Sequence, residues 1–298
     1  MKTFDPEKMG KLPKSHRFFD VNDLWYFANV RMVRWLFNKP ISANQITLLS
    51  LSLGVLSVCF YLSSNSKALV FGALCLYGKL FFDNVDGMLA RARGETSRIG
   101  RFFDSFVDFV INVAIYTALS AHLFRQTGQM DWWAIGFFAL LSCFIHCSLF
   151  VFYLVQYTAR VGSYDKNRVR EKVTKEDGIA RKKGEMSALQ FFLQKFHQFA
   201  YDWQDALIER LDNICRRLAN VGSSDEWYLD KKFLVLAGPL CLCTNTMALI
   251  VFSLFECLDV CFLLVATGGN VYMAGIVIWK TLRFRKSSLL NTAPLRGR

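Results

Sequence analysis

Residues 83–108 read DNVDGMLARARGETSRIGRFFDSFVD, and long apolar stretches lie on both sides of them. The segment contains four aspartates at i/i+3 and i/i+4 spacing, namely Asp83, Asp86, Asp104 and Asp108. A carboxylate at the centre of a membrane helix costs about 2.5–3.5 kcal/mol, so acids within apolar spans indicate a functional site. Carboxylate oxygens are the ligands that Mg²⁺, Mn²⁺ and Ca²⁺ prefer. The segment therefore predicts a site for hard cations.

The composition around this segment is that of a polytopic membrane protein. Of the 298 residues, 53% are hydrophobic, and the mean hydropathy is +0.25. A membrane-spanning helix needs about 20 predominantly apolar residues. Stretches of this kind occur at residues 43–63, 68–89, 102–124, 132–158, 233–255 and 260–279. We therefore expect an all-α integral membrane protein with six transmembrane helices.

Basic residues are distributed unevenly between the segments that connect these stretches. If both termini are cytoplasmic, the inner segments contain 33 of the 36 Lys and Arg residues. The outer loops contain only Lys67 and Arg125, and Lys79 lies within a span. Because cytoplasmic loops are enriched in Lys and Arg, both termini and the aspartate segment are expected on the cytoplasmic side. This bias and anionic lipid surfaces explain the net charge of +12 without a nucleic-acid partner.

The chain is expected to divide into four regions. They are a basic tail with an interfacial amphipathic helix (1–39), transmembrane helices 1–4 with the aspartate motif 83–108 (40–158), a cytoplasmic basic and helical insert (159–232), and transmembrane helices 5–6 with a basic C-terminal tail (233–298). Within the insert, Ser187 is a possible helix cap, and apolar residues then recur at helical spacing. We expect one long or two short amphipathic helices there, which pack over the site, form a dimer contact or bind lipid.

The spacing of the aspartates places them on facing helices. Residues three and four apart share one face of a helix, so Asp83 and Asp86 lie together, as do Asp104 and Asp108. The turn at 91–99 folds the two helices into an antiparallel pair. Two divalent ions about 3.5–4 Å apart can be shared by such a set of carboxylates. Lys79 is either an ion-pair partner of this site or a snorkelling side chain, and the sequence leaves both open.

The same segment resembles a known family. Its pattern, D-x2-D-G-x2-A-R-x8-G-x3-D-x3-D, is met in full and resembles the signature of the CDP-alcohol phosphotransferase (CDP-alcohol phosphatidyltransferase) family. The matching residues are Asp83, Asp86, Gly87, Ala90, Arg91, Gly100, Asp104 and Asp108. The six-span layout with a preceding interfacial helix is also similar, so the likeness covers most of 20–158 and, more loosely, 233–280. The insert is not part of it.

The resemblance implies roles for these residues. It implies that Asp83, Asp86, Asp104 and Asp108 hold divalent metals, with two Mg²⁺ or Mn²⁺ ions expected, and that Asp108 is also the general base. It implies that Gly87, Ala90, Arg91 and Gly100 bind the CDP moiety, and that Asn44 and Thr47 resemble the family's Asn-x-x-Thr element near the nucleotide. Family members are commonly homodimers, and the same is expected here.

The resemblance leaves the substrate open between two branches of the family. One branch moves a phosphatidyl group from CDP-diacylglycerol to a small alcohol and releases CMP. The other moves the headgroup phosphate from CDP-choline or CDP-ethanolamine to diacylglycerol. Six spans and 298 residues favour the first branch. A membrane ion or lipid transporter and an intramembrane prenyltransferase are rival hypotheses, but the single compact acidic set and the missing inverted repeat disfavour them.

Overall fold

The computed structural model describes residues 4–10, 12–19, 25–63, 65–161, 177, 179, 181, 186–222 and 225–292. Within these ranges the chain is helical and contains no strand. Six helical segments are long and apolar enough to cross a membrane: Ala43–Leu62, Lys67–Arg93, Arg98–Thr127, Asp131–Arg160, Asp225–Leu254 and Leu258–Ser287. The prediction of an all-α protein with six transmembrane helices is therefore confirmed.

The first four spans are single helices, α2 (Ala43–Leu62), α3 (Ser66–Arg93), α4 (Arg98–Thr127) and α5 (Asp131–Arg160). Helix α2 begins with a capping box, in which Ser42 Oγ accepts from the Gln45 amide and Gln45 Oε1 accepts from the Ser42 amide. Helix α3 ends at Gly94, whose φ of 68° lies in the left-handed region that favours glycine. Ser97 then caps α4, so the chain reverses within four residues.

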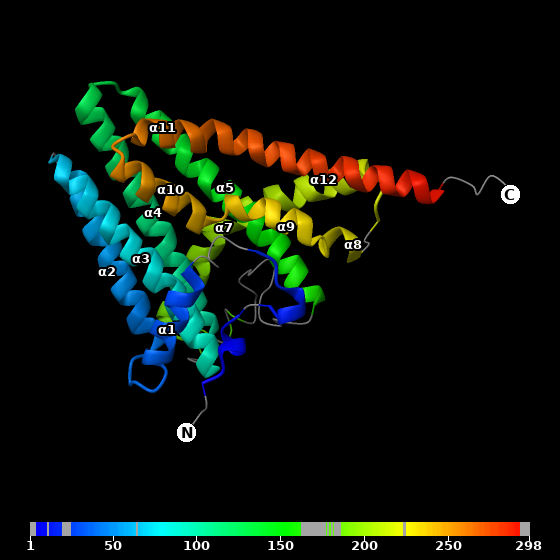
Figure 1. Cartoon of the computed structure of the whole chain (residues 1–298), viewed down its shortest axis with the longest axis horizontal. Helices are drawn as coiled ribbons and strands as arrows, with labels where there is room; N and C mark the ends of the chain where they lie inside the picture. Colours follow the sequence, from blue (N-terminus) through cyan, green and yellow to red (C-terminus); the bar gives the residue numbers. More distant parts are fainter. Residues whose placement is uncertain are drawn as a thin grey trace.

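These four helices form the body of the bundle (Figure 1). Helix α2 packs against both α3 and α4, and α4 packs against α5. Small residues allow the close approaches that stabilise helix pairs in membranes. A side chain at Gly54 would lie 3.0 Å from Ile111, and one at Gly136 would lie 1.9 Å from Ser120 Oγ. Larger residues at these two positions would push α2 away from α4, and α5 away from α4.

The fifth span is broken, whereas the sequence predicted one continuous helix over 233–255. It consists of α8 (Asp225–Tyr228), α9 (Lys231–Ala237), the 3₁₀ turn η4 (Gly238–Leu240) and α10 (Leu242–Leu254). The break falls at Pro239, which has no amide hydrogen to donate to the helix. The sixth span comprises α11 (Leu258–Leu263), the π-helical η5 (Leu264–Gly268) and α12 (Gly269–Thr292), which projects from the bundle in Figure 1.

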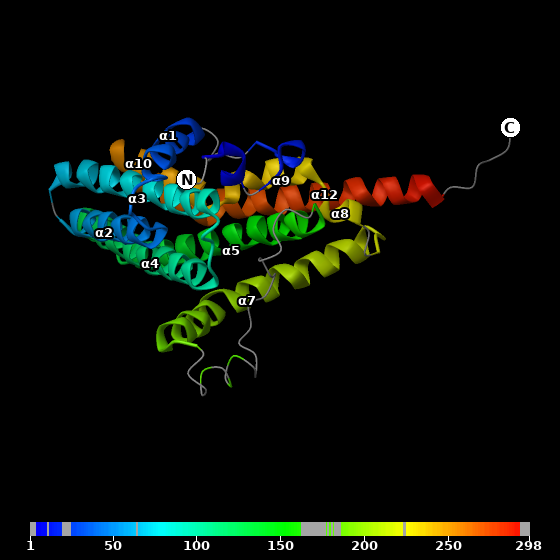
Figure 2. The ribbon, with the colours of Figure 1, turned by 90° about the horizontal axis from the view of Figure 1, so that it is seen from below.

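The insert contains one long helix, α7 (Ala188–Leu218). Ser187 caps it by accepting from the Gln190 amide at 3.1 Å. Helix α7 slants across the bundle and packs against α4 and α5 (Figure 2). Of the alternatives that the sequence left open, a single helix packed over the bundle is the one observed. The highly basic stretch at 162–176 lies outside the described residues.

The N-terminal region packs near the end of α3. It comprises η1 (Pro6–Met9), η2 (Lys14–His16) and α1 (Tyr26–Leu36), and α1 and η1 both contact α3. The helix expected at 20–38 is thus present from Tyr26, and residues 20–24 lie outside the described residues. Its position at a membrane interface stays a prediction.

A candidate metal centre between α3 and α4

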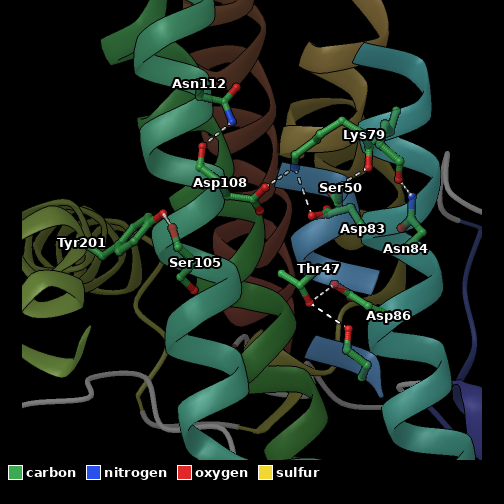
Figure 3. Close-up of polar contacts among 12 residues, drawn as sticks. Thr47, Ser50, Lys79, Asp83, Asn84, Asp86, Ser105, Asp108, Asn112 and Tyr201 are labelled. Atoms are coloured by element: carbon green, nitrogen blue, oxygen red, sulfur yellow. Dashed lines mark hydrogen bonds and ion pairs between the residues drawn. The ribbon is translucent and has the colours of Figure 1, made fainter. Parts of the chain in front are cut away.

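Three of the four predicted aspartates come together. One carboxylate oxygen from each of Asp83 on α3 and Asp104 and Asp108 on α4 lies within 4.8 Å of the other two. The side chains of Asp83 and Asp108 are 15% and 17% exposed, so the cluster is partly accessible. Asp83 and Asp108 point toward each other across the space between the two helices (Figure 3). Helix α2 packs against both helices and fixes their separation.

Lys79 pairs with two of these carboxylates. Its ammonium donates to Asp83 Oδ1 at 3.1 Å and also to Asp108 Oδ1 (Figure 3). The Lys79 side chain is 5% exposed. The ion pair, and not a snorkelling side chain, is therefore the observed arrangement. It links α3 to α4 directly at the acidic cluster.

Asp86 has a different partner. It is 4% exposed and accepts a hydrogen bond from Thr47 Oγ1 on α2. It lies about one turn from Asp83 along α3, toward Gly94. The structure therefore brings Asp86 and Thr47 together beside the three-carboxylate cluster, and two predicted site residues form one contact.

The chemistry of the cluster fits a divalent cation. Asp104 Oδ1 is buried and has no hydrogen-bond partner among the described residues. An uncompensated buried carboxylate oxygen is costly, and a bound cation would remove that cost. Three carboxylates within reach of one another supply the oxygen donors that Mg²⁺ and Mn²⁺ prefer. Asp83, Asp104 and Asp108 are thus the residues that would hold such an ion, with Asp86 one turn away.

The residues predicted to bind nucleotide lie on the side of the cluster nearer the Gly94 turn. A side chain at Gly87 would lie 3.2 Å from Arg91 Nη1, and one at Gly100 would lie 3.5 Å from Asn44 Oδ1. The start of α2 and the start of α4 therefore meet at Asn44 and Gly100. Arg91 Nε donates to the Met9 carbonyl at 2.7 Å, which ties η1 to α3. Ala90, in the same turn of α3, is partly buried.

One contact at the site was missed at the sequence level. Tyr201 of α7 donates from its hydroxyl to the Ser105 carbonyl at 2.9 Å, between Asp104 and Asp108 on α4 (Figure 3). Burial, and then the nearby Asp108 carboxylate, raise the pKa of Tyr201, so its hydroxyl stays protonated and donates. No motif marks Tyr201, because its role depends on how α7 folds back onto α4.

The fold and the site define a multi-pass membrane protein with a cluster of three carboxylates that could hold a metal ion. Residues 40–173 match the family model described as CDP-alcohol phosphatidyltransferase, and this range includes α2–α5 and the whole acidic motif. The predicted resemblance to this family is therefore confirmed for residues 40–173. The family consists of transferases of phosphate-containing groups, which disfavours the transporter and prenyltransferase alternatives.

Three curated relatives are similar to part of the chain. The chain is 32% identical over 105 residues to a bifunctional IPC transferase and DIPP synthase from Aquifex aeolicus, covering 35% of this chain and 23% of the relative. It is 29% identical over 116 residues to archaetidylinositol phosphate synthase from Pyrococcus horikoshii, covering 39% and 56%. It is 28% identical over 83 residues to inner membrane protein YnbA from Escherichia coli, covering 28% and 41%. The matches thus span at most about half the length of these relatives.

Proposed function

We propose that this protein moves a phosphatidyl group from CDP-diacylglycerol to a small alcohol and releases CMP in a reaction that depends on a divalent metal. The observation that carries this proposal is the convergence of Asp83, Asp104 and Asp108 between two helices of the family-matched segment. A centre of this kind can bind the charged diphosphate of a CDP-linked substrate at one end of a membrane bundle.

The CDP-diacylglycerol branch is supported by the relatives and by the fold. Two of them are named as synthases, one of archaetidylinositol phosphate and one as an IPC transferase and DIPP synthase. The six candidate spans among the described residues also favour that branch. The acceptor is a small alcohol, and candidates are serine, inositol phosphate and glycerol phosphate.

Each residue of the centre has a role in this proposal. A bound divalent ion would neutralise the diphosphate and the departing CMP phosphate. Asp83, Asp86, Asp104 and Asp108 would hold that ion, as the motif implies. Asp108 takes the proton from the acceptor hydroxyl, whose oxygen bonds to the phosphorus of the phosphatidyl group while the bond from that phosphorus to the CMP oxygen breaks. Because Asp108 is fixed on the same face as Asp104, the base and the reacting phosphate can be held together.

The nucleotide would bind beside the cluster, on the side of the Gly94 turn. Gly87 and Ala90 have little side-chain bulk on the face of α3 next to Asp86, and Arg91 follows one turn along. Asn44 and Gly100 lie close together where the start of α2 meets the start of α4. Thr47 holds Asp86 by its hydrogen bond. Both termini and this region are proposed to be cytoplasmic, and the protein is proposed to be a homodimer, as family members commonly are.

A reconstituted assay tests the proposal. Purified full-length protein with Mg²⁺ or Mn²⁺ is offered labelled CDP-diacylglycerol or CDP-choline and a panel of acceptors, and CMP and lipid products are followed. We expect CMP and a phosphatidyl product from CDP-diacylglycerol, loss of both with a chelator, and recovery when the ion is restored. Product from CDP-choline with diacylglycerol would assign the protein to the other branch, and turnover without divalent metal would refute the metal scheme.

A paired substitution tests the base. Asp108→Asn is expected to abolish product formation while the protein still folds, because the amide cannot accept the proton. Asp131→Asn, an exposed change in the first turn of α5, is the control and is expected to retain turnover. Near-normal turnover by Asp108→Asn would refute the role of Asp108 as the base.

A further inference from the structure

A positive charge is built into the acidic centre. Lys79 precedes Asp83 by one turn of α3, on the side away from Gly94, and its ammonium lies between Asp83 and Asp108 (Figure 3). The Lys79 carbonyl accepts from Ser50 Oγ of α2 at 3.0 Å, so a polar contact to a neighbouring helix fixes the backbone at this position as well.

The Lys79 ammonium is buried and cannot reach the end of α3 near Gly94. Lys79 lies 14 residues before Arg93, the last residue of α3, which corresponds to roughly 21 Å of helix. A lysine side chain is far shorter than that, and Asp83 lies between its ammonium and this end of the helix. A buried ammonium is tolerated when carboxylates pair with it and is costly otherwise. Lys79 is therefore expected to stay where it is in every state of the site.

We propose that Lys79 is a resident cation of the metal centre, which holds Asp83 and Asp108 together from the inner side and weakens the binding of divalent ions. This inference rests on the proposed function, because it concerns the same centre. Lys79 places one positive charge among the four aspartates, where it pairs with Asp83 and Asp108. A divalent ion then binds from the side of the Gly94 turn, where Asp104 Oδ1 has no hydrogen-bond partner among the described residues.

The inference has two consequences. First, the carboxylates do not need a divalent ion to stay together, because the ammonium already bridges α3 and α4. Second, each divalent ion that enters meets a like charge a few ångströms away. In a partly buried site, repulsion between an ammonium and a divalent ion at this distance lowers the affinity for the ion by more than a factor of ten. Removing the charge of Lys79 should therefore tighten metal binding and should make the fold depend on the metal.

Metal binding alone tests the first point. Full-length protein in detergent is titrated with Mn²⁺, and free Mn²⁺ is followed by electron paramagnetic resonance. Lys79→Met is expected to bind Mn²⁺ at least about tenfold more tightly than the wild type. Lys79→Arg keeps the charge and is expected to stay within about twofold of the wild type. Lys67→Met, an exposed change near the start of the same helix, removes a distant charge and should have no effect.

Thermal unfolding tests the second point and covers a variant that folds poorly without metal. Lys79→Met is purified with Mn²⁺, and the unfolding midpoint is measured with Mn²⁺ and with a chelator. The midpoint shift caused by Mn²⁺ is expected to be larger in Lys79→Met than in the wild type by about 2–4 °C or more. An equal or smaller shift, or unchanged or weaker Mn²⁺ binding by Lys79→Met, would overturn the inference.

Failure of this inference and failure of the proposed function are distinguishable. CMP formation from CDP-diacylglycerol by the wild type, together with unchanged Mn²⁺ affinity in Lys79→Met, would overturn only the role of Lys79. Absence of Mn²⁺ binding by both proteins would overturn the inference together with the metal-dependent reaction.

Discussion

The four aspartates of the centre have different partners. Asp83 and Asp108 pair with Lys79, Asp86 accepts from Thr47, and Asp104 Oδ1 has no hydrogen-bond partner among the described residues. Like-charged groups this close repel unless cations or donors compensate them. The carboxylates therefore differ in what they can bind. Asp83 and Asp108 are paired with the Lys79 ammonium, whereas Asp104 Oδ1 can still accept a ligand.

For stability and for CMP formation, the hydroxyl group of Thr47 should be more important than the volume of the Thr47 side chain. Thr47→Val keeps the shape but leaves the buried Asp86 carboxylate without this donor, which costs about 1–3 kcal/mol. We expect lower thermal stability in detergent and slower CMP formation. Thr117→Val is the matched control, because the exposed Thr117 hydroxyl donates to the Val113 carbonyl of its own helix. Equal effects of the two substitutions would show that the contact with Asp86 has no special importance.

Part of this arrangement could be predicted from the sequence. The i/i+4 spacing places Asp104 and Asp108 on one face of a helix, and the short turn at Gly94 brings α3 back beside it. The bond between Thr47 and Asp86 could not be predicted, because it joins residues 39 positions apart through the packing of α2. Whether the Lys79 side chain forms an ion pair could not be predicted for the same reason, since this depends on Asp108, a carboxylate 29 positions away.

Helix α7 supports the centre from outside the family-matched segment. Its Tyr201 hydroxyl reaches the Ser105 carbonyl of α4, and its ring packs edge-on against Phe109. Phe196, five residues earlier on α7, packs against Phe106 and Phe109. These contacts lie along the turn of α4 that carries Asp104 and Asp108. The insert is therefore in a position to fix the backbone on which two of the three clustered carboxylates stand.

Tyr201→Phe tests this support. The ring stays, and the bond to the Ser105 carbonyl is lost, which costs about 0.5–1.5 kcal/mol. We expect CMP formation to slow several-fold through kcat with little change in KM, since Tyr201 holds α4 in place. Tyr272→Phe is the control, because that hydroxyl donates to the Leu236 carbonyl away from the centre. If Tyr272→Phe slows the reaction as much as Tyr201→Phe, α7 has no specific influence on the centre.

A buried carboxylate joins α7 to the fifth span. Asp212 is 2% exposed and accepts from Tyr153 of α5, Trp227 and Tyr228 of α8, and Arg216 of its own helix, at 2.7–3.1 Å. A carboxylate with this many donors is fully satisfied. The network therefore fixes the position of α8, which the sequence did not predict, because short helices of this kind depend on tertiary contacts more than on local pattern.

Asp212→Ala should be among the most damaging changes outside the centre. It leaves several buried donors without an acceptor, and it removes a negative charge near the buried Lys280 ammonium, which lies 3.8 Å from the Tyr153 ring centre. Breaking a buried charged network costs about 3–5 kcal/mol. Asp225→Ala is the control, since Asp225 is 74% exposed and its pair with Arg160 is worth about 0–1 kcal/mol. Comparable unfolding midpoints for the two variants would contradict this account.

On the scale of the whole molecule, the bundle has two different ends. The α3–α4 turn and the N-terminal region lie near the acidic centre, whereas the α2–α3 and α4–α5 turns lie at the far ends of the same helices. The hydrophobic pattern predicted the six spans, because long apolar runs have few alternatives in a membrane. It did not predict the break at Pro239 or the path of α7, since both depend on how distant helices pack.

The basic residues predict which end faces the cytoplasm. Of the 36 Lys and Arg residues, 33 lie in the segments that the six-span topology assigns to the same side of the membrane as the α3–α4 turn. Positively charged segments are retained on the cytoplasmic side during insertion, so this end should be cytoplasmic. Glu95→Cys in the α3–α4 turn and Gln129→Cys in the α4–α5 turn place exposed thiols at opposite ends. With a membrane-impermeant maleimide, and relative to the parent protein, we expect Gln129→Cys to react in intact cells and Glu95→Cys to react only after permeabilisation. The reverse pattern would place the acidic centre on the outer side, out of reach of a cytoplasmic CDP-linked substrate.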